Sequence, residues 1–365
     1  NYGGTVEGDT FPVTATVDGK SFTVDDKGNV ISTGSSDETP IENDTLGTVT
    51  GSEEKNTKVK DSLGNQVVVP AGFKVVNPND NVTDGIVVED VSHSATAGSQ
   101  FVWIPVGDVI KDSNGNKETI TLSRYTFADD NVGTPIDQGS AEIEAIYDSN
   151  CNHTEVNTST NGNTTAKENI ESEESGFRKS VKDNHGYYIG RYEARDKSAT
   201  SARTSSSVET NQLVCTANNY VYNYITQPKA AELSRGMYSD SNFESDLMNS
   251  YAWDTAIVFL QKFDNRANKT KPYSQQNSLN TSNDGLASQG TNNLSDISKQ
   301  DVICNVYDMA SNCIEWTTET CSYSSGPCTS RGGDSYSSYY YTGCRFNNNS
   351  SSSNDLISFR PLLYM

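Results

Sequence analysis

Short runs of alternating apolar and polar residues dominate this chain, and they predict a protein built mainly from short strands. The first run is Phe11 to Val17, and a second begins at Ser21 after the pair Asp18-Gly19. Alternating β-branched residues around Asp-Gly are typical of a β-hairpin. From Ser32 to Asn56 the sequence is polar and lacks aromatic residues. We therefore expect residues 1–57 to form an N-terminal β-hairpin followed by a linker or arm.

A second group of strand patterns begins at Val59. A β-branched run over 66–76 is interrupted by Pro70 and Gly72, which do not suit the interior of a central strand. Polar residues dominate 108–180 and 266–298, so we expect surface insertions in both places. Further strands are predicted at 85–89, 100–106, 186–194, 302–312 and 313–319.

Two helices are predicted between these strands. Thr226 can cap a helix over 227–233 that has Pro228 in its first turn, and Ser245 can cap a second helix over 246–263. Strands combined with central helices and large loops indicate an α+β domain whose termini meet in one sheet. One face of the second helix carries an apolar stripe at helical spacing, which predicts core packing: Leu247, Met248, Tyr251, Ala252, Thr255, Val258, Phe259 and Phe263.

Composition narrows the classes of partner. The chain has 365 residues, 33% hydrophobic residues and a net charge of -21, so it can bury a sizeable core beneath extensive polar loops. A balance this acidic argues against nucleic acid as a partner, because phosphate binding needs a basic surface. No apolar run reaches the ~18 residues of a membrane-spanning helix. The abundance of Asn, Ser, Thr and Gly favours an extracellular, cell-surface or virion location.

The cysteines leave several chemistries open. There are 7, an odd number, so at least one lacks a partner within the chain. The spacing of Cys321 and Cys328 would allow a disulfide across a short turn. Cys304 and Cys313 lie in apolar sequence and are equally consistent with buried thiols. No Cys-x-x-Cys pair occurs and the histidines are scattered, so we expect no metal cofactor, with a structural calcium ion as the remaining alternative.

The C-terminal segment combines aromatic and small polar residues in an unusual proportion. It contains Tyr339 to Tyr341, Asn347 to Asn349 and the serine run 350–353. Tyrosine supplies a large contact at low entropy cost, while Ser, Gly and Asn supply adaptable hydrogen bonds, as in antibody paratopes. A disordered tail is the competing interpretation. The apolar ending 359–365 argues against it and predicts a last strand that returns to the core.

Ordered motifs across 58–365 resemble the formylglycine-generating-enzyme-like (sulfatase-modifying factor) branch of the C-type lectin fold. Residues 1–57 lie outside this resemblance. The fold it implies is an α+β C-type lectin fold with long polar insertions. The motifs are Val68-Val69-Pro70-Ala71-Gly72, Phe101-Val102-Trp103-Ile104-Pro105, Tyr188-Ile189-Gly190-Arg191-Tyr192-Glu193, Tyr307 to Asn312 with Glu315-Trp316, Arg331-Gly332-Gly333 and Phe359-Arg360-Pro361.

Within that branch the chain is most similar to the variable proteins of diversity-generating retroelements, of the type found in gut Firmicutes and their phages. In that family a reverse transcriptase rewrites adenines near the 3′ end of the gene, and the resulting residue spectrum matches 334–357. The resemblance implies a non-catalytic display protein with a variable region at about 329–358 that binds a protein or glycan ligand. The implied ligand-facing residues are Asp334, Tyr336, Ser337, Tyr339, Tyr340, Tyr341, Cys344, Phe346, Asn347, Asn348 and Asn349.

Three other functions were weighed against this one. A formylglycine-generating oxidase needs two neighbouring cysteines after the Gly-Gly pair, where this chain has Ser335 to Ser338. A calcium-dependent lectin needs a Trp-Asn-Asp motif, which is missing here. A structural or adhesive subunit of a surface filament or phage tail is the third, and it would assemble through the N-terminal arm or as a homo-oligomer. We expect Trp316 to be a core ring and Arg360 to pair with a carboxylate.

Overall fold

The chain divides into two compact units, residues 1–43 and 44–365, which are described separately. In the first unit the structure, a computed structural model, describes the backbone of three strands: β1 (Val13–Val17), β2 (Lys20–Val24) and β3 (Val30–Ser35). In the second unit, β13 (Ile143–Glu144), β14 (Thr154–Glu155) and Thr320 are likewise described by backbone alone. Side chains are described for 45–127, 133–135, 176–207, 212–217, 220–266, 272–275, 301–319, 326, 328–335 and 340–365.

The three strands of the first unit form an antiparallel meander. β1 pairs with β2, and Val17 lies opposite Lys20 on either side of the Asp18-Gly19 pair. β2 then pairs with β3, with a register irregularity between Thr23 and Val24. The predicted hairpin is therefore confirmed, and it has a third strand that the sequence pattern did not predict.

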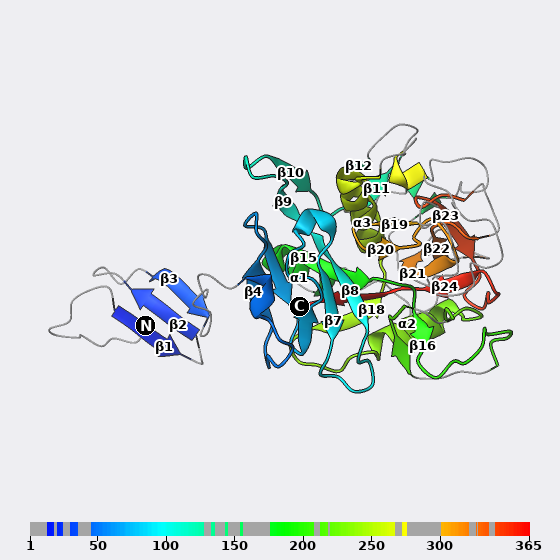
Figure 1. The fold of residues 1–365 in the computed structure, drawn as a ribbon, viewed down its shortest axis with the longest axis horizontal. Helices are drawn as coiled ribbons and strands as arrows, with labels where there is room; N and C mark the ends of the chain where they lie inside the picture. The colour runs from blue at the N-terminus through cyan, green and yellow to red at the C-terminus, as the bar shows by residue number, and fades with distance from the viewer. Residues whose placement is uncertain are drawn as a thin grey trace. The chain divides into compact units, whose positions relative to one another are not determined.

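A six-stranded sheet carries the core of the second unit (Figure 1). Every neighbouring pair in it is antiparallel, including the last strand, which lies between β15 and β18. The predicted return of the C-terminus to the core is confirmed. In spatial order the strands are β18 (Glu244–Leu247), β25 (Pro361–Tyr364), β15 (Gly186–Gly190), β8 (Gln100–Pro105), β7 (Val87–Asp90) and β6 (Phe73–Val75).

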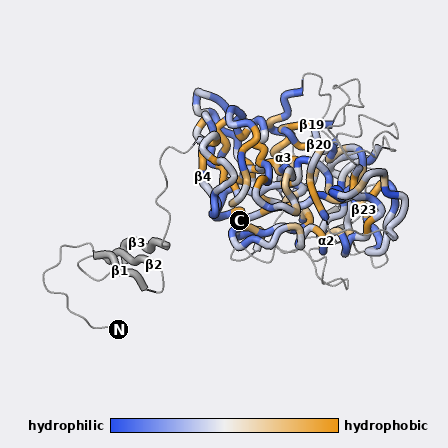
Figure 2. The backbone as a smooth tube through the Cα atoms, turned by 60° about the horizontal axis from the view of Figure 1, so that its bottom comes forward, coloured by the Kyte–Doolittle hydropathy of each residue, from blue (hydrophilic) through white to orange (hydrophobic). Residues whose placement is uncertain are grey.

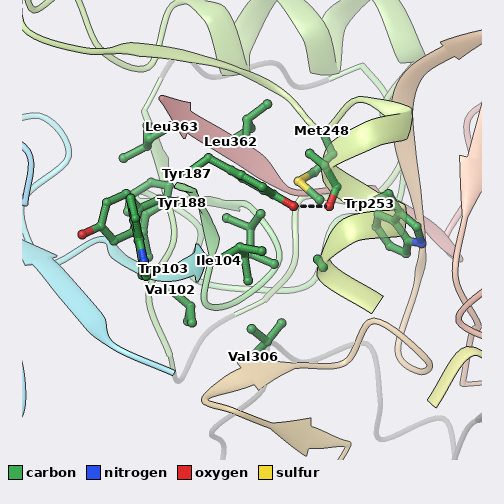
Figure 3. Packing of buried hydrophobic residues seen from close by; sticks show 14 of the residues in the cluster. Val102, Trp103, Ile104, Tyr187, Tyr188, Met248, Trp253, Val306, Leu362 and Leu363 are labelled. Carbon is green, nitrogen blue, oxygen red and sulfur yellow. Dashed lines mark hydrogen bonds between the residues drawn. The ribbon is translucent and has the colours of Figure 1, made fainter. Parts of the chain in front are cut away.

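Large aromatic side chains fill the space between this sheet and the helices. Figure 3 shows Trp103 beside Tyr188, with ring centroids 5.0 Å apart, and the hydroxyl of Tyr187 donating to the Ala252 carbonyl at 2.7 Å. Tyr187 lies in strand β15 and Ala252 lies in the helix over 250–263. Their hydrogen bond therefore fixes this helix against the sheet. The hydropathy colouring in Figure 2 shows apolar segments running through the second unit, with polar segments around them.

Three α-helices occur in the described part of the second unit: α1 (Gly176–Asn184), α2 (Gln227–Arg235) and α3 (Ser250–Phe263). α2 begins after Thr226 as predicted, although the Thr226 side chain makes no capping hydrogen bond. The predicted start of the other helix was wrong. Residues 244–247 form β18, and Asn249 caps α3 by accepting a hydrogen bond from the Ala252 N–H at 2.8 Å.

A second sheet of four strands carries the C-terminal third of the chain. Its neighbouring pairs are antiparallel except that β21 and β24 are parallel. The side chain of Trp316 in β21 is fully buried and its indole N–H donates to the Ile225 carbonyl, which confirms it as a core ring. The order is β23 (Arg345–Asn348), β22 (Cys328–Arg331), β21 (Ile314–Thr320) and β24 (Ile357–Phe359).

Shorter elements complete the second unit. They form two-stranded ladders, β4 with β5, β9 with β10, β11 with β12, β13 with β14, β16 with β17 and β19 with β20, and 3-10 turns. Their bounds are η1 (Leu46–Thr48), β4 (Thr57–Lys60), β5 (Gln66–Val69), η2 (Val82–Asp84), β9 (Gly107–Ile110), β10 (Lys117–Ile120), β11 (Tyr125–Thr126), β12 (Thr134–Pro135), β16 (Arg195–Asp196), β17 (Leu213–Val214), η3 (Tyr273–Gln275), β19 (Val302–Ile303) and β20 (Val306–Tyr307).

The N-terminal boundary of the larger unit lies before the predicted residue 58. Leu46 is buried in its core, Thr50 bridges Lys74, and the Gly72 N–H donates to the Glu53 carbonyl at 3.0 Å. Residues 44–57 therefore belong to the larger unit and are not a linker. No helix in the described ranges is long and apolar enough to cross a membrane.

Candidate ligand-binding surface

Within the predicted ligand-facing segment, the described residues 340–344 form a loop, and the residues after them form the edge strand β23 of the four-stranded sheet. Tyr340, Tyr341 and Phe346 are half-buried and pack by part of their surface against the core. The rings of Tyr340 and Phe346 meet edge to face with centroids 4.6 Å apart. These side chains thus have one supported face and one accessible face.

The three asparagines continue this surface along β23 and into the next turn. Asn347 and Asn348 are half-buried and Asn349 is exposed. The Asn348 amide donates to the Ser330 hydroxyl at 2.8 Å. The Asn349 Oδ1 accepts from the Ser351 N–H and hydroxyl, which closes the turn. Two of the three amides are therefore already held by hydrogen bonds within the protein.

Two of the expected ligand-facing residues are in the interior. Asp334 is 3% exposed and Cys344 is 0% exposed, and Cys344 is bonded in a disulfide. Their placement on the surface was therefore wrong, because neither side chain is accessible to a ligand. Tyr336, Ser337 and Tyr339 lie outside the described residues.

A network of four buried charges lies beneath this surface. Asp254 of α3 and Glu319 of β21 each pair with both Arg331 of β22 and Arg345 of β23. The Arg331 Nη1 lies 2.7 Å from Glu319 Oε2, and the Arg345 Nε lies 2.7 Å from Glu319 Oε1. All four side chains are at most 1% exposed, and two positive charges balance two negative ones. We call these residues the charge quartet.

The quartet shifts the pKa values of Glu319 and Arg345. Burial acts to raise the pKa of Glu319, but the charges of Arg331 and Arg345 outweigh it and the pKa lies below the usual value. Burial acts to lower the pKa of Arg345, and Asp254 and Glu319 raise it above the usual value. Glu319 and Arg345 are thus held in their charged forms, as a paired buried network requires.

Buried donors also fix the backbone of the loop itself. The Trp253 indole N–H donates to the Thr342 carbonyl at 3.0 Å, and the Arg331 Nε donates to the Cys344 carbonyl at 2.9 Å. The Gly343 N–H donates to the Ser274 carbonyl at 2.9 Å. Because these contacts use backbone atoms of the loop, they do not depend on which side chains the loop presents.

The Gly-Gly pair after β22 is required by close backbone packing. Gly332 has φ 90°, and a Cβ there would lie 2.5 Å from the Met309 carbonyl oxygen. At Gly333 a Cβ would lie 2.2 Å from the Ala310 carbonyl oxygen. Any larger residue would push β22 away from the 309–310 segment.

The predicted pairing of Arg360 is confirmed. Its Nη2 lies 2.6 Å from Glu315 Oε1 and its Nε donates to Glu315 Oε2 at 3.1 Å, so the pair is bidentate. The Nη1 donates to the Gly190 carbonyl at 2.7 Å, which connects the two sheets. Arg360 is fully buried, so its role is to support the framework.

The cysteine prediction is partly corrected. Cys328 is buried and not disulfide-bonded, so the suggested Cys321–Cys328 disulfide does not form. Cys304 and Cys313 are free thiols, as one interpretation expected, and burial raises the pKa of both. Within the described ranges, no three or more His, Cys, Asp or Glu side chains gather where they could hold a metal ion.

Sequence reasoning missed Asp254, Glu319 and Arg345. Asp254 was detectable, because it is an isolated acidic residue in the apolar sequence of α3 and is 0% exposed. Its partners were not detectable, because 77 residues separate it from Arg331 and 91 from Arg345. The quartet depends on the packing of α3 against the four-stranded sheet.

Comparisons with known proteins add little to this geometry. No protein-family model matches the chain, and no curated protein does. Among solved structures, the chain is similar to PvdO from Pseudomonas aeruginosa, with 11% sequence identity and a TM-score of 0.36. The alignment covers 73% of this chain and 95% of PvdO. A likeness this distant carries no statement about function.

Proposed function

We propose that this chain is a non-catalytic display protein, and that the surface around Tyr340, Tyr341, Phe346 and Asn347 binds a variable protein or glycan ligand. The observation that carries the proposal is that the accessible side chains of this surface are distinct from the buried groups that hold its backbone. Half-exposed aromatic and amide side chains sit on a backbone that buried charges and hydrogen bonds hold from below. Such an arrangement tolerates exchange of the outer side chains, as a diversified surface requires.

We also propose a fold family, a location and a source of sequence diversity for this chain. The ordered motifs of 58–365 favour a C-type lectin fold of the formylglycine-generating-enzyme-like branch, and an α+β arrangement with a returning C-terminal strand is compatible with it. We place the protein at a bacterial cell surface or on a phage virion. The residue spectrum of 334–357 supports diversification by a retroelement.

The surface chemistry suggests how a ligand would be held. Between 340 and 354 Arg345 is the sole charged residue, and it is buried in the quartet. Recognition would therefore rely on aromatic contact and hydrogen bonds instead of ion pairs. Aromatic anchors dominate the energy of such interfaces. The affinity is expected to change little with salt concentration.

Sequencing the DNA beside the gene tests the retroelement directly. We expect a reverse transcriptase gene and a near-repeat of the 3′ end that differs from it at template adenines. Absence of both would contradict the claim that a retroelement diversifies this surface. It would favour a generic adhesin of a surface filament or phage tail.

A display library tests the binding surface. Tyr340, Tyr341, Phe346 and Asn347 are randomised together and selected against lysozyme as a defined probe protein. A matched library randomises Thr317, Thr329, Ser330 and Thr342, which are fully buried in the same region. We expect folded binders from the first library and loss of folded protein in the second. Equal losses of folded protein in both libraries would contradict the proposed division into surface and support.

A further inference from the structure

Arg195 is a buried arginine far from the charge quartet in sequence. It lies in β16 and is 3% exposed. Its Nη1 donates to the Thr216 carbonyl at 2.5 Å, the Thr216 hydroxyl at 2.8 Å and the Ala217 carbonyl at 2.5 Å. These contacts hold one end of the guanidinium in a fixed orientation, but all of its acceptors are neutral.

The other edge of this guanidinium has no partner in the described part of the chain. Its Nε is buried and has no hydrogen-bond acceptor, and the described side-chain hydrogen bonds of Arg195 all involve Nη1. No described carboxylate pairs with it, whereas Arg331, Arg345 and Arg360 are each bound by one or two. A buried arginine is rarely left unpaired, because removing its charge from water is costly.

The surroundings of Arg195 leave its charge uncompensated. Burial lowers its pKa to about 10, and Cys215 is the ionisable group that acts on it. Burial raises the pKa of Cys215 to about 12, so this thiol is neutral at pH 7. Two residues further on, Lys197 is exposed, and its Nζ donates to the carbonyls of Ser94 and Ala95. Asp196, between these two residues, is buried, and its Oδ1 accepts hydrogen bonds from the Ser198 N–H and hydroxyl and not from the Arg195 guanidinium.

We propose that the Nε–Nη2 edge of Arg195 binds a carboxylate group. The N–H groups on this edge of a planar guanidinium point in parallel, and their spacing matches the two oxygens of a carboxylate. A bound carboxylate would give the buried Nε–H its missing acceptor and would neutralise the charge. The shared chemistry is a carboxylate, supplied either by a small molecule or by an acidic side chain of a partner. This inference is independent of the surface around Tyr340.

Nuclear magnetic resonance of protein labelled with 15N in arginine tests the binding. The Arg195→Lys variant identifies the Arg195 Nε–H signal, because lysine keeps the charge and lacks this edge. Acetate is titrated at constant ionic strength against chloride, and a hexaglutamate peptide is titrated separately. We expect a saturable shift of the Arg195 signal and a rise of a few degrees in the melting temperature. A response to acetate alone indicates a small carboxylate as the source, and a response to the peptide indicates a polypeptide.

The Arg203→Gln variant is the matched control. Arg203 is a neighbouring arginine whose Nε already donates to the Asn223 carbonyl at 2.9 Å. Its variant should keep the full acetate response, and Arg195→Lys should lose the rise in melting temperature. An unshifted Arg195 signal in the wild-type protein, an equal effect of chloride, or an undiminished response of Arg195→Lys would each overturn the proposal. If a variant fails to fold, the melting temperature of the wild-type protein decides: a rise with acetate that chloride does not reproduce supports binding, and no such rise overturns the proposal.

Discussion

Arg331 Nη2 lies 2.6 Å from Asp254 Oδ1, and neither side chain has any exposed surface. This ion pair joins α3 to β22 directly beneath the loop that carries Tyr340 and Tyr341. The same guanidinium lies over the Trp253 ring, 5.6 Å from its centroid, and donates to the Cys344 carbonyl. One arginine thus connects a helix, a strand and the candidate binding loop, and its charge is balanced within the quartet.

The first prediction concerns charge balance in the quartet. Arg345→Met leaves Asp254 and Glu319 with Arg331 alone, so one buried negative charge becomes uncompensated. We expect the free energy of unfolding to fall by about 3–5 kcal/mol. Urea denaturation monitored by tryptophan fluorescence measures the change.

The double variant Glu319→Gln/Arg345→Met is the control for this prediction. It removes one charge of each sign and leaves the Arg331–Asp254 pair intact, so it should recover much of the lost stability. A double variant less stable than Arg345→Met alone would show that charge balance is not the reason for the loss.

The second prediction concerns the Gly-Gly pair. Gly333→Ala places a Cβ where the Ala310 carbonyl oxygen lies, so β22 or the 309–310 segment must move. We expect a loss of roughly 3 kcal/mol or more, in the range of severe backbone and packing defects. Gly47→Ala is the control, because neither Gly47 nor Gly333 has a positive φ, and the nearest atom to a Cβ at Gly47, in the Pro78 side chain, would lie 3.4 Å away. Similar losses of stability in the two variants would attribute the effect to conformational freedom and not to close packing.

Local sequence predicted most of the strand patterns and the start of α2, because these follow from side-chain periodicity and proline placement. It predicted that the apolar residues of the second helix are core residues, but Leu247 and Met248 precede α3, and α3 is buried on all sides over 250–261 instead of along one stripe. It failed at the start of α3. Ser245 is a good capping residue by type, but its hydroxyl accepts a hydrogen bond from the Tyr238 N–H, and its strand pairs with β25. Pairing with β25, more than a hundred residues later in the chain, therefore makes 244–247 a strand and not the first turn of the helix. Local sequence also failed at Asp334 and Cys344. Both lie in a segment whose composition is typical of a binding surface, but both side chains are buried.

The third prediction concerns the aromatic pair at the candidate binding surface. Tyr340 and Phe346 meet edge to face, and such pairs are worth about 0.5–1.5 kcal/mol beyond their burial. Alanine at each position and at both, measured by urea denaturation, should give a coupling energy in that range. A coupling energy of zero would mean that the two rings contribute independently, and the edge-to-face contact would then stabilise nothing.

The fourth prediction concerns pH and Asp246. Burial raises the pKa of Asp246 from 3.8 to about 6, although Arg235, whose Nε lies 2.8 Å from Asp246 Oδ1, opposes the change. Between these pH values the folded protein binds more protons than the unfolded chain, so this residue lowers stability as pH rises. The difference amounts to about 3 kcal/mol, since one pKa unit corresponds to about 1.4 kcal/mol.

Asp246→Asn removes this titration while leaving an oxygen that can accept from Arg235 and from the Leu247 N–H. The stability of the variant relative to wild type should therefore increase by about 2.4 kcal/mol between pH 4 and pH 7, because pH 4 already lies above the unfolded pKa. Comparing the two proteins at each pH cancels the opposite contribution of Glu319, whose lowered pKa makes the fold weaker in acid. Asp355→Asn changes the same charge at an exposed position and should show no such trend. A pH-independent difference for Asp246→Asn would mean that the buried carboxyl is already charged at pH 4, and that Arg235 compensates its burial completely.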